Sequence, residues 1–176
     1  KSETRNIGKK LAPKATLNAS TVTLKVKQST SRLKVTRLAK GDSVKSWKSS
    51  NSKIFTVRGK SNGTCKITGK KSGTAKLQIT LASGLKKTVK VRVQTAAVKT
   101  SKITVSKNVT VRKGKRVTLK PVVTPFTSRQ KVTYTSSNKK IATVSSKGVV
   151  TGKKKGTVKI TVKSGSKSVK VTVKVK

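Results

Sequence analysis

The chain has 176 residues, of which 46 are lysine or arginine and only two, Glu3 and Asp42, are acidic, giving a formal net charge of +44. It contains no histidine and a single cysteine. It therefore cannot build a histidine-based triad, a catalytic pair of carboxylates within one domain or a conventional metal site. A serine–lysine nucleophile pair stays open by composition, but no spacing singles one out. We expect a chain that is not an enzyme and that needs no cofactor or metal.

Residues 1–13 carry four basic side chains without apolar periodicity and are predicted to be a lead-in segment. The first alternating run follows at Val22–Val26, where apolar and polar residues exchange with a period of two. Such alternation is typical of a strand with one buried face. The chain beyond residue 13 is therefore expected to begin with a β-strand.

A repeated phrase follows. Ser49–Ile54 reads Ser-Ser-Asn-Ser-Lys-Ile, and 136–141 reads Ser-Ser-Asn-Lys-Lys-Ile. The aromatic residue two positions before each phrase is Trp47 in the first copy and Tyr134 in the second, 87 residues later. Two copies in one order predict two tandem modules. We place them at 14–95 and 99–176, with a short join between.

The residues of the repeated phrase have mainly structural interpretations. The Ser-Ser-Asn triplets are predicted to form turns in which the side chains bond to nearby backbone groups. Trp47 and Tyr134 are expected to plug the core between two sheets, as buried aromatic residues commonly do. Cys65 alternates with Ile67, which predicts a buried, unreactive thiol.

A second repeated element places lysines between two glycines. Glycine-flanked turns can present neighbouring backbone N–H groups to an anion, and lysines would add charge. The alternative is a tight hairpin turn with solvated lysines. The candidate anion-binding residues are Gly69, Lys70, Lys71 and Gly73 in the first copy, and Gly152, Lys153, Lys154, Lys155 and Gly156 in the second.

Further alternating runs occupy 89–93, 158–162 and 169–175, and no segment has a helical period of useful length. Short Val-, Ile- and Thr-rich strands separated by Gly, Ser and Asn predict an all-β chain. Modules of this size most economically pack two antiparallel sheets face to face. Phe126, which follows Thr124 and Pro125 in a predicted turn, is a candidate exposed contact.

The repeated pattern resembles the bacterial immunoglobulin-like domain of group 2, and the resemblance covers nearly the whole chain. The first copy carries it at Trp47, Ser49, Ser50, Asn51, Ile54, Thr56, Val57, Thr68, Gly69, Gly73 and Thr74. The second copy carries it at Tyr134, Ser136, Ser137, Asn138, Ile141, Ala142, Thr143, Val144, Gly148, Val149, Val150, Thr151, Gly152, Gly156 and Thr157. The second copy fits better, because Phe55 stands where Ala142 does. The resemblance implies two tandem immunoglobulin-like antiparallel β-sandwiches.

The resemblance also implies a place on bacterial surface proteins, adhesins or secreted enzymes, where such domains act in adhesion or as spacers. Some bacterial immunoglobulin-like modules bind calcium through acidic loops, but two acids cannot supply such a loop here. The expected location is extracellular, at the cell surface or in the cell wall. We expect a monomer that is part of a longer chain.

The high positive charge of both modules is a feature that the resemblance does not imply. The net charge is +19 over 14–95, from 20 basic residues and one acid, and +22 over 96–176, from 22 basic residues. Such a surface attracts polyanions, so the expected partners are anionic polymers such as teichoic acid or acidic glycans. The alternatives are a passive spacer whose charge only keeps it soluble, and a nonspecific nucleic-acid binder. The chain has four aromatic residues, so stacking on nucleic-acid bases would contribute little to binding. No membrane span is predicted, since no apolar run is long enough.

Overall fold

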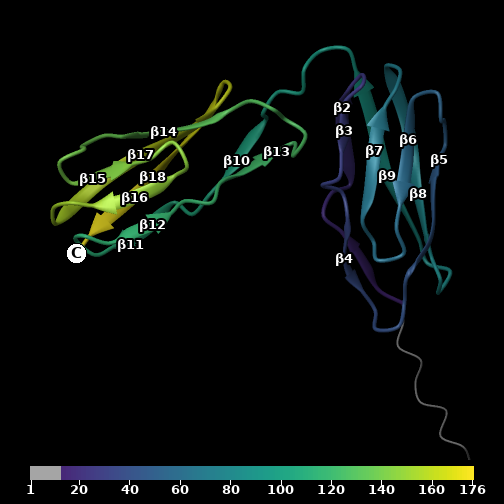
Figure 1. Cartoon of the computed structure of the whole chain (residues 1–176), viewed down its shortest axis with the longest axis horizontal. Coiled ribbons are helices and arrows are strands. Elements are labelled where there is room, and N and C mark those ends of the chain that lie inside the picture. The colour runs from purple at the N-terminus through teal and green to yellow at the C-terminus, as the bar shows by residue number, and fades with distance from the viewer. Residues whose placement is uncertain (1–12) are drawn as a thin grey trace, which may run out of the picture. The chain divides into compact units, whose positions relative to one another are not determined.

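The computed structural model describes residues 13–176, so the predicted lead-in lies outside the described residues except for Pro13. All regular elements of the described chain are β-strands (Figure 1). The chain divides into two compact units, with the boundary between Thr95 and Ala96. The all-β expectation is confirmed.

The first unit is a sandwich of two main sheets, drawn in purple to teal in Figure 1. One sheet has four strands in the order β2-β9-β8-β5, the other has three in the order β3-β7-β6, and β1 pairs separately with β4. The strands are β1 (Ala15–Leu17), β2 (Thr21–Lys25), β3 (Ser29–Thr30), β4 (Val35–Leu38), β5 (Val44–Ser49), β6 (Phe55–Gly59), β7 (Cys65–Gly69), β8 (Gly73–Leu81) and β9 (Lys86–Gln94).

The second unit repeats this architecture. Its four-stranded sheet has the order β11-β18-β17-β14, its three-stranded sheet the order β12-β16-β15, and β10 pairs separately with β13. The strands are β10 (Lys102–Thr104), β11 (Asn108–Val111), β12 (Arg116–Thr118), β13 (Val122–Thr124), β14 (Val132–Ser136), β15 (Ala142–Val144), β16 (Val149–Gly152), β17 (Gly156–Ser164) and β18 (Lys167–Val175).

One pairing in each unit is parallel. Strand β2 runs parallel to β9, with Thr21 opposite Lys90, and β11 runs parallel to β18, with Asn108 opposite Thr172. All other strand pairs are antiparallel. The parallel pair joins the early and the final strand of each unit, so that both ends of a module are held in one sheet.

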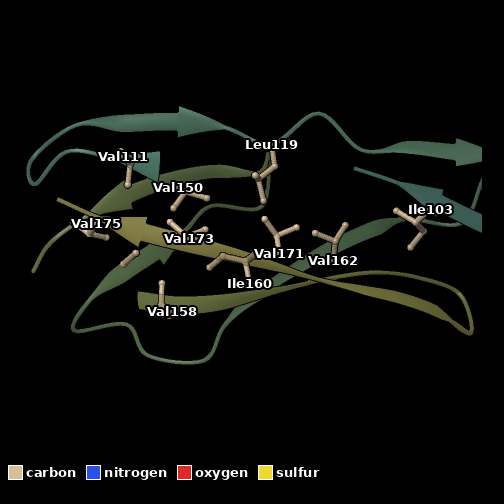
Figure 2. Packing of buried hydrophobic residues seen from close by; sticks show 11 residues of the cluster. Ile103, Val111, Leu119, Val150, Val158, Ile160, Val162, Val171, Val173 and Val175 are labelled. Carbon is tan, nitrogen blue, oxygen red and sulfur yellow. The ribbon is translucent and has the colours of Figure 1, made fainter. Parts of the chain in front are cut away.

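The cores follow from the alternation in the sequence. From Val158 in β17 and from Val171 in β18 every second residue is buried, and Ile160, Val162, Val171 and Val173 point into the core that Val150 enters from the opposite sheet (Figure 2). The outward residues of the same strands are mainly lysine and threonine, and Lys159, Lys163, Lys170 and Lys174 are exposed. The four alternating runs fall on β2, β9, β17 and β18 except for Val26, which follows β2, and their apolar residues are buried except for Val26 and Val169, which are half-buried.

The largest fully buried side chain of the first unit is Phe55, which is 0% exposed. Ala142, at the matching position of the second unit, is also fully buried. The two positions therefore lie in equivalent parts of the two cores, but the first core holds a phenylalanine ring there and the second an alanine.

Candidate anion-binding surface

The two glycine–lysine turns do not close hairpins. The first connects β7 to β8 and the second connects β16 to β17, and in each case the two strands belong to different sheets. The hairpin prediction is therefore wrong: each turn carries the chain from one layer of the sandwich to the other. Lys70, Lys71 and Lys153–Lys155 are exposed at these crossings.

Four backbone N–H groups of these turns already have carbonyl partners. The N–H groups of Lys70 and Lys71 both donate to the carbonyl oxygen of Ile54, at 2.7 and 3.2 Å. In the second unit the N–H groups of Lys153 and Lys154 donate to Ile141, at 2.8 and 3.1 Å. These four groups cannot form the expected backbone nest, because a carbonyl fills the place of the anion. The lysine side chains remain as candidate anion contacts, which is still a prediction.

The glycines of the turns have a packing role. Gly73 and Gly156 each have a φ of +150°, and a β-carbon there would meet Ile54 and Ile141 respectively. A β-carbon on Gly152 would lie 3.0 Å from the carbonyl oxygen of Arg112, on the segment after β11. Glycine is needed here for backbone conformation and close approach, whether or not an anion binds.

The Ser-Ser-Asn triplets are confirmed as turn formers. The Asn51 side chain accepts from the N–H of Lys53 at 3.0 Å, and that of Asn138 accepts from Lys140 at 3.0 Å. Ser50 Oγ accepts from the N–H of Lys76 at 2.8 Å, which ties the end of β5 to β8. The side chains that dominate the repeated phrase therefore hold the backbone.

The two aromatic residues of the repeat are half-buried and not enclosed between the sheets as expected, although Tyr134 does pack against the core cluster of the second unit. Each ring lies over a glycine, Trp47 over Gly59 and Tyr134 over Gly148. A β-carbon on either glycine would clash with the ring. Trp47 Nε1 donates to the carbonyl oxygen of Lys60 at 3.2 Å. Both residues sit on edge strands, β5 and β14. They close the side of the sandwich, where one edge of the ring keeps access to water.

Phe126 is half-buried next to the cis Thr124–Pro125 peptide bond, so it offers less surface than the predicted contact requires. Among the large apolar side chains of the described residues, Val122 on β13 is the exposed one, at 60%. Its place in the sequence gave no sign of this, because it lies in an ordinary apolar pair, Val122-Val123.

Cys65 is buried as predicted, and its Sγ donates to the carbonyl oxygen of Leu33 at 3.4 Å. Burial raises the pKa of the thiol from 9.0 to about 11. The thiolate is the reactive form, so the native chain should react with a thiol reagent at pH 8 orders of magnitude more slowly than the urea-unfolded chain. Because the folded-state pKa is the higher one, the thiol's contribution to stability is complete below pH 9 and is lost as the pH rises through 11.

Ellman's reagent on native and unfolded chain measures this difference directly. Equal rates in the two states would show that Cys65 is accessible and would contradict the buried geometry. The Cys65→Ser variant serves as the blank, since it removes the thiol and keeps a donor toward Leu33.

Asp42 is the one acidic residue among residues 13–176. Its carboxylate accepts from the Ser83 hydroxyl at 2.6 Å and from the backbone N–H groups of Ser43 and Ser83 at 2.9 and 3.1 Å. The Ser83 hydroxyl and these backbone donors hold the pKa of Asp42 below its usual value. The carboxylate links the loop before β5 to the loop between β8 and β9.

Within residues 13–176, histidine, cysteine, aspartate and glutamate nowhere gather in a group of three that could hold a metal ion. The same stretch contains no helix of the length and apolar character needed to span a membrane.

The outward face of each four-stranded sheet carries exposed basic residues. In the first unit this face presents Lys48 from β5, Lys76 from β8, Lys90 and Arg92 from β9 and Lys25 from β2, all exposed. No local pattern in the sequence distinguishes these residues from the other lysines and arginines. The pairing of β8 with β9 through Gly84 is the signal that would have brought Lys76 and Lys90 together.

Among solved structures, domains 4 and 5 of the S-layer protein SbsC share 25% identity with this chain, over 93% of this chain and 97% of that one, with a TM-score of 0.44. Domains 1–6 of SbsC share 29% identity over 77% of this chain, with a TM-score of 0.42, and the chain spans about a fifth (20%) of that structure. A termite-gut xylanase containing a bacterial Ig-like domain shares 27% identity over 39% of this chain and 18% of that one, with a TM-score of 0.34. No curated protein matches the chain.

The sequence profile described as "Bacterial Ig-like domain (group 2)" matches residues 98–175. These residues form the second sandwich, with its strand order β11-β18-β17-β14 over β12-β16-β15. Residues 98–175 therefore belong to the bacterial Ig-like domain family, group 2.

Proposed function

We propose that this chain is a non-catalytic module of a bacterial cell-surface or secreted protein, and that it binds anionic polymers through the cationic faces of its sandwiches. Residues 14–95, the first unit, are proposed to be another domain of the same family as residues 98–175. Two observations support this: the first unit has the same strand order and the same parallel pair as the second, and its Ser-Ser-Asn and Gly-Lys turns make the matching hydrogen bonds.

The observation that carries the binding proposal is the lack of counter-charge on an ordered surface. The second unit has 22 basic residues and no acid, and the one acid described in the first unit bonds to Ser43 and Ser83. Lysines on neighbouring strands lie well within the Debye length of about 8 Å at physiological salt, so they repel one another. A polyanion removes that repulsion and releases its own counterions on binding.

Two other functions start from the same surface. A passive spacer in adhesion or in a wall-associated stalk is favoured by one observation: the residues of the repeated motif serve turns and packing. Nonspecific nucleic-acid binding follows from the charge alone, but Trp47 and Tyr134 are half-buried at the sandwich edge and form no stacking platform.

Co-sedimentation with purified Gram-positive cell walls tests the proposal. We expect the chain to pellet with intact walls in physiological salt and to stay in the supernatant with walls stripped of teichoic acid by acid extraction. A chain with lysines acetylated is the control for charge. Equal pelleting with both preparations, or none with either, would contradict binding to the anionic polymer; the second result supports the spacer.

A further inference from the structure

Like charges face each other directly on the outer face of the first unit. Lys76 of β8 lies opposite Lys90 of β9 in the antiparallel register. Residues in this relation have β-carbons about 5 Å apart, and like charges there destabilise the sheet. Lys48 lies opposite Gln78, one diagonal step from Lys76, and Arg92 lies opposite Thr74, one diagonal step on the other side. A cationic diagonal therefore crosses three strands.

The face is hollowed along this diagonal. A shallow hollow of about 570 Å³ is lined by Ser20, Ser50, Thr74, Ala75, Lys76, Thr88 and Lys90. A second hollow of about 410 Å³ shares Ser50, Lys76 and Thr88 with it and adds Lys48. These two adjoining hollows, together called the groove, are lined by three lysines and several serine and threonine residues, and no acid lines them.

The second unit lacks this arrangement at the matching positions. Lys159 of β17 lies opposite Thr172 of β18, and Thr161 lies opposite Lys170, so lysine and threonine alternate across the sheet. Thr135 on β14 stands where Lys48 stands on β5, because Thr135 pairs with Thr161 as Lys48 pairs with Gln78. One chain therefore carries the same sheet face with and without the opposed lysines.

We propose that the groove lined by Lys48, Lys76 and Lys90 is a binding site for the phosphate or sulfate groups of a linear anionic polymer of polyol or sugar units. This proposal rests on the proposed function. It places the strongest contact with the polymer on the outward face of the four-stranded sheet of the first unit. A tetrahedral oxyanion between the two opposed ammonium groups replaces repulsion by two charge-assisted contacts, and the serine and threonine hydroxyls can donate to its remaining oxygens. No aromatic side chain lines either hollow, which disfavours a partner held by base stacking.

The decisive variant gives the first unit the pattern of the second: Lys48→Thr together with Lys90→Thr. Threonine suits an exposed strand position, so the sheet should keep its pairing. The matched control is Lys159→Thr with Lys170→Thr, which removes the same charge from the same face of the second unit. The full chain is titrated by calorimetry with wall teichoic acid, with heparin and with duplex DNA, each separately, from low to physiological salt.

We expect the first variant to weaken binding about tenfold or more at physiological salt and to lower the slope of log affinity against log salt by about 2, whereas the control changes affinity less than about twofold. Teichoic acid responding more than heparin identifies phosphate as the source, and the reverse identifies sulfate. Equal weakening by variant and control, or an effect on duplex DNA alone, would overturn the site while leaving the proposed function intact. Absence of wild-type binding to every polymer would overturn both.

A converse variant keeps the test independent of any loss of folding. Thr135→Lys with Thr172→Lys builds the opposed lysines into the second unit, and the affinity for the preferred polymer should rise. Amide chemical shifts locate the contact: in the wild type they should move in β5, β8 and β9, and in the converse variant also in β14, β17 and β18. Shifts spread evenly over both units would contradict a site.

Discussion

Replacing Phe55 with alanine is expected to lower the free energy of unfolding of the first unit by about 3–5 kcal/mol. Phe55 is 0% exposed and is the largest fully buried side chain of the described residues. A domain of this size buries only about 60–65% of the surface of its unfolded chain, so its stability is modest and such a loss is a large share of it. The first unit of the variant should be marginally folded at 37 °C.

Trp47 makes this measurement specific, because it is the one tryptophan of the chain and lies in the first unit. Urea unfolding followed by its fluorescence reports the first unit, while methyl resonances of Val171 and Val173 report the second. The matched control is Phe126→Ala in the second unit, whose half-buried ring should cost less and leave the tryptophan transition in place. A tryptophan transition within about 1 kcal/mol of wild type for Phe55→Ala would contradict the packing.

The second large effect is the dependence of polymer binding on salt. If six to ten charges of a polyanion are neutralised, raising the salt from about 50 to 200 mM should weaken duplex DNA binding by about 10³–10⁵-fold. The reason is that affinity of this kind comes from released counterions and is not tied to base contacts. Fluorescence anisotropy of a labelled duplex across the salt range gives the slope.

A chain with acetylated lysines is the control for this slope, because acetylation removes the charge and keeps most of each side chain. Its binding should be weak at every salt concentration. A wild-type affinity that stays flat across the same range would contradict an electrostatic surface.

The sandwich could be predicted from the sequence because strand faces depend on a local pattern. In β17 and β18 the period of two alone sets Ile160 and Val171 inward and Lys159 and Lys170 outward. The Ser-Ser-Asn turns were predictable for the same reason, since Asn51 and Asn138 bond two residues along the chain. Such features need no knowledge of the opposite sheet.

Features that depend on partners distant in sequence could not be predicted this way. The Gly-Lys turns were expected to close hairpins, but whether a turn stays in one sheet or crosses to the other depends on where β8 and β17 pair. Trp47 and Tyr134 were expected in the core; their half-burial follows from the edge positions of β5 and β14. The N–H groups of Lys70, Lys71, Lys153 and Lys154 cannot form the nest because Ile54 and Ile141, in the turns just before β6 and β15, supply carbonyl oxygens to them.

A buried polar cluster in the second unit was also beyond the local pattern. Thr100 Oγ1 lies 2.8 Å from Ser164 Oγ and 2.9 Å from Ser128 Oγ, and Ser164 donates to the carbonyl oxygen of Gln130 at 3.2 Å. Thr100 and Ser164 are both buried. Ser164 is the last residue of β17, and the last residue of the matching strand β8 in the first unit is the buried apolar Leu81. Polar residues can occupy a core position only when such partners satisfy them, and these partners lie 28 and 64 residues from Thr100.

The most direct test of the proposed polymer binding is the affinity of the full two-unit chain for wall teichoic acid, heparin and duplex DNA, matched for charge and measured in physiological salt. We predict that binding to one phosphate- or sulfate-bearing polymer survives while duplex DNA is released. Loss of all three together along one salt slope would contradict the claim and would leave the cationic sandwiches as a spacer.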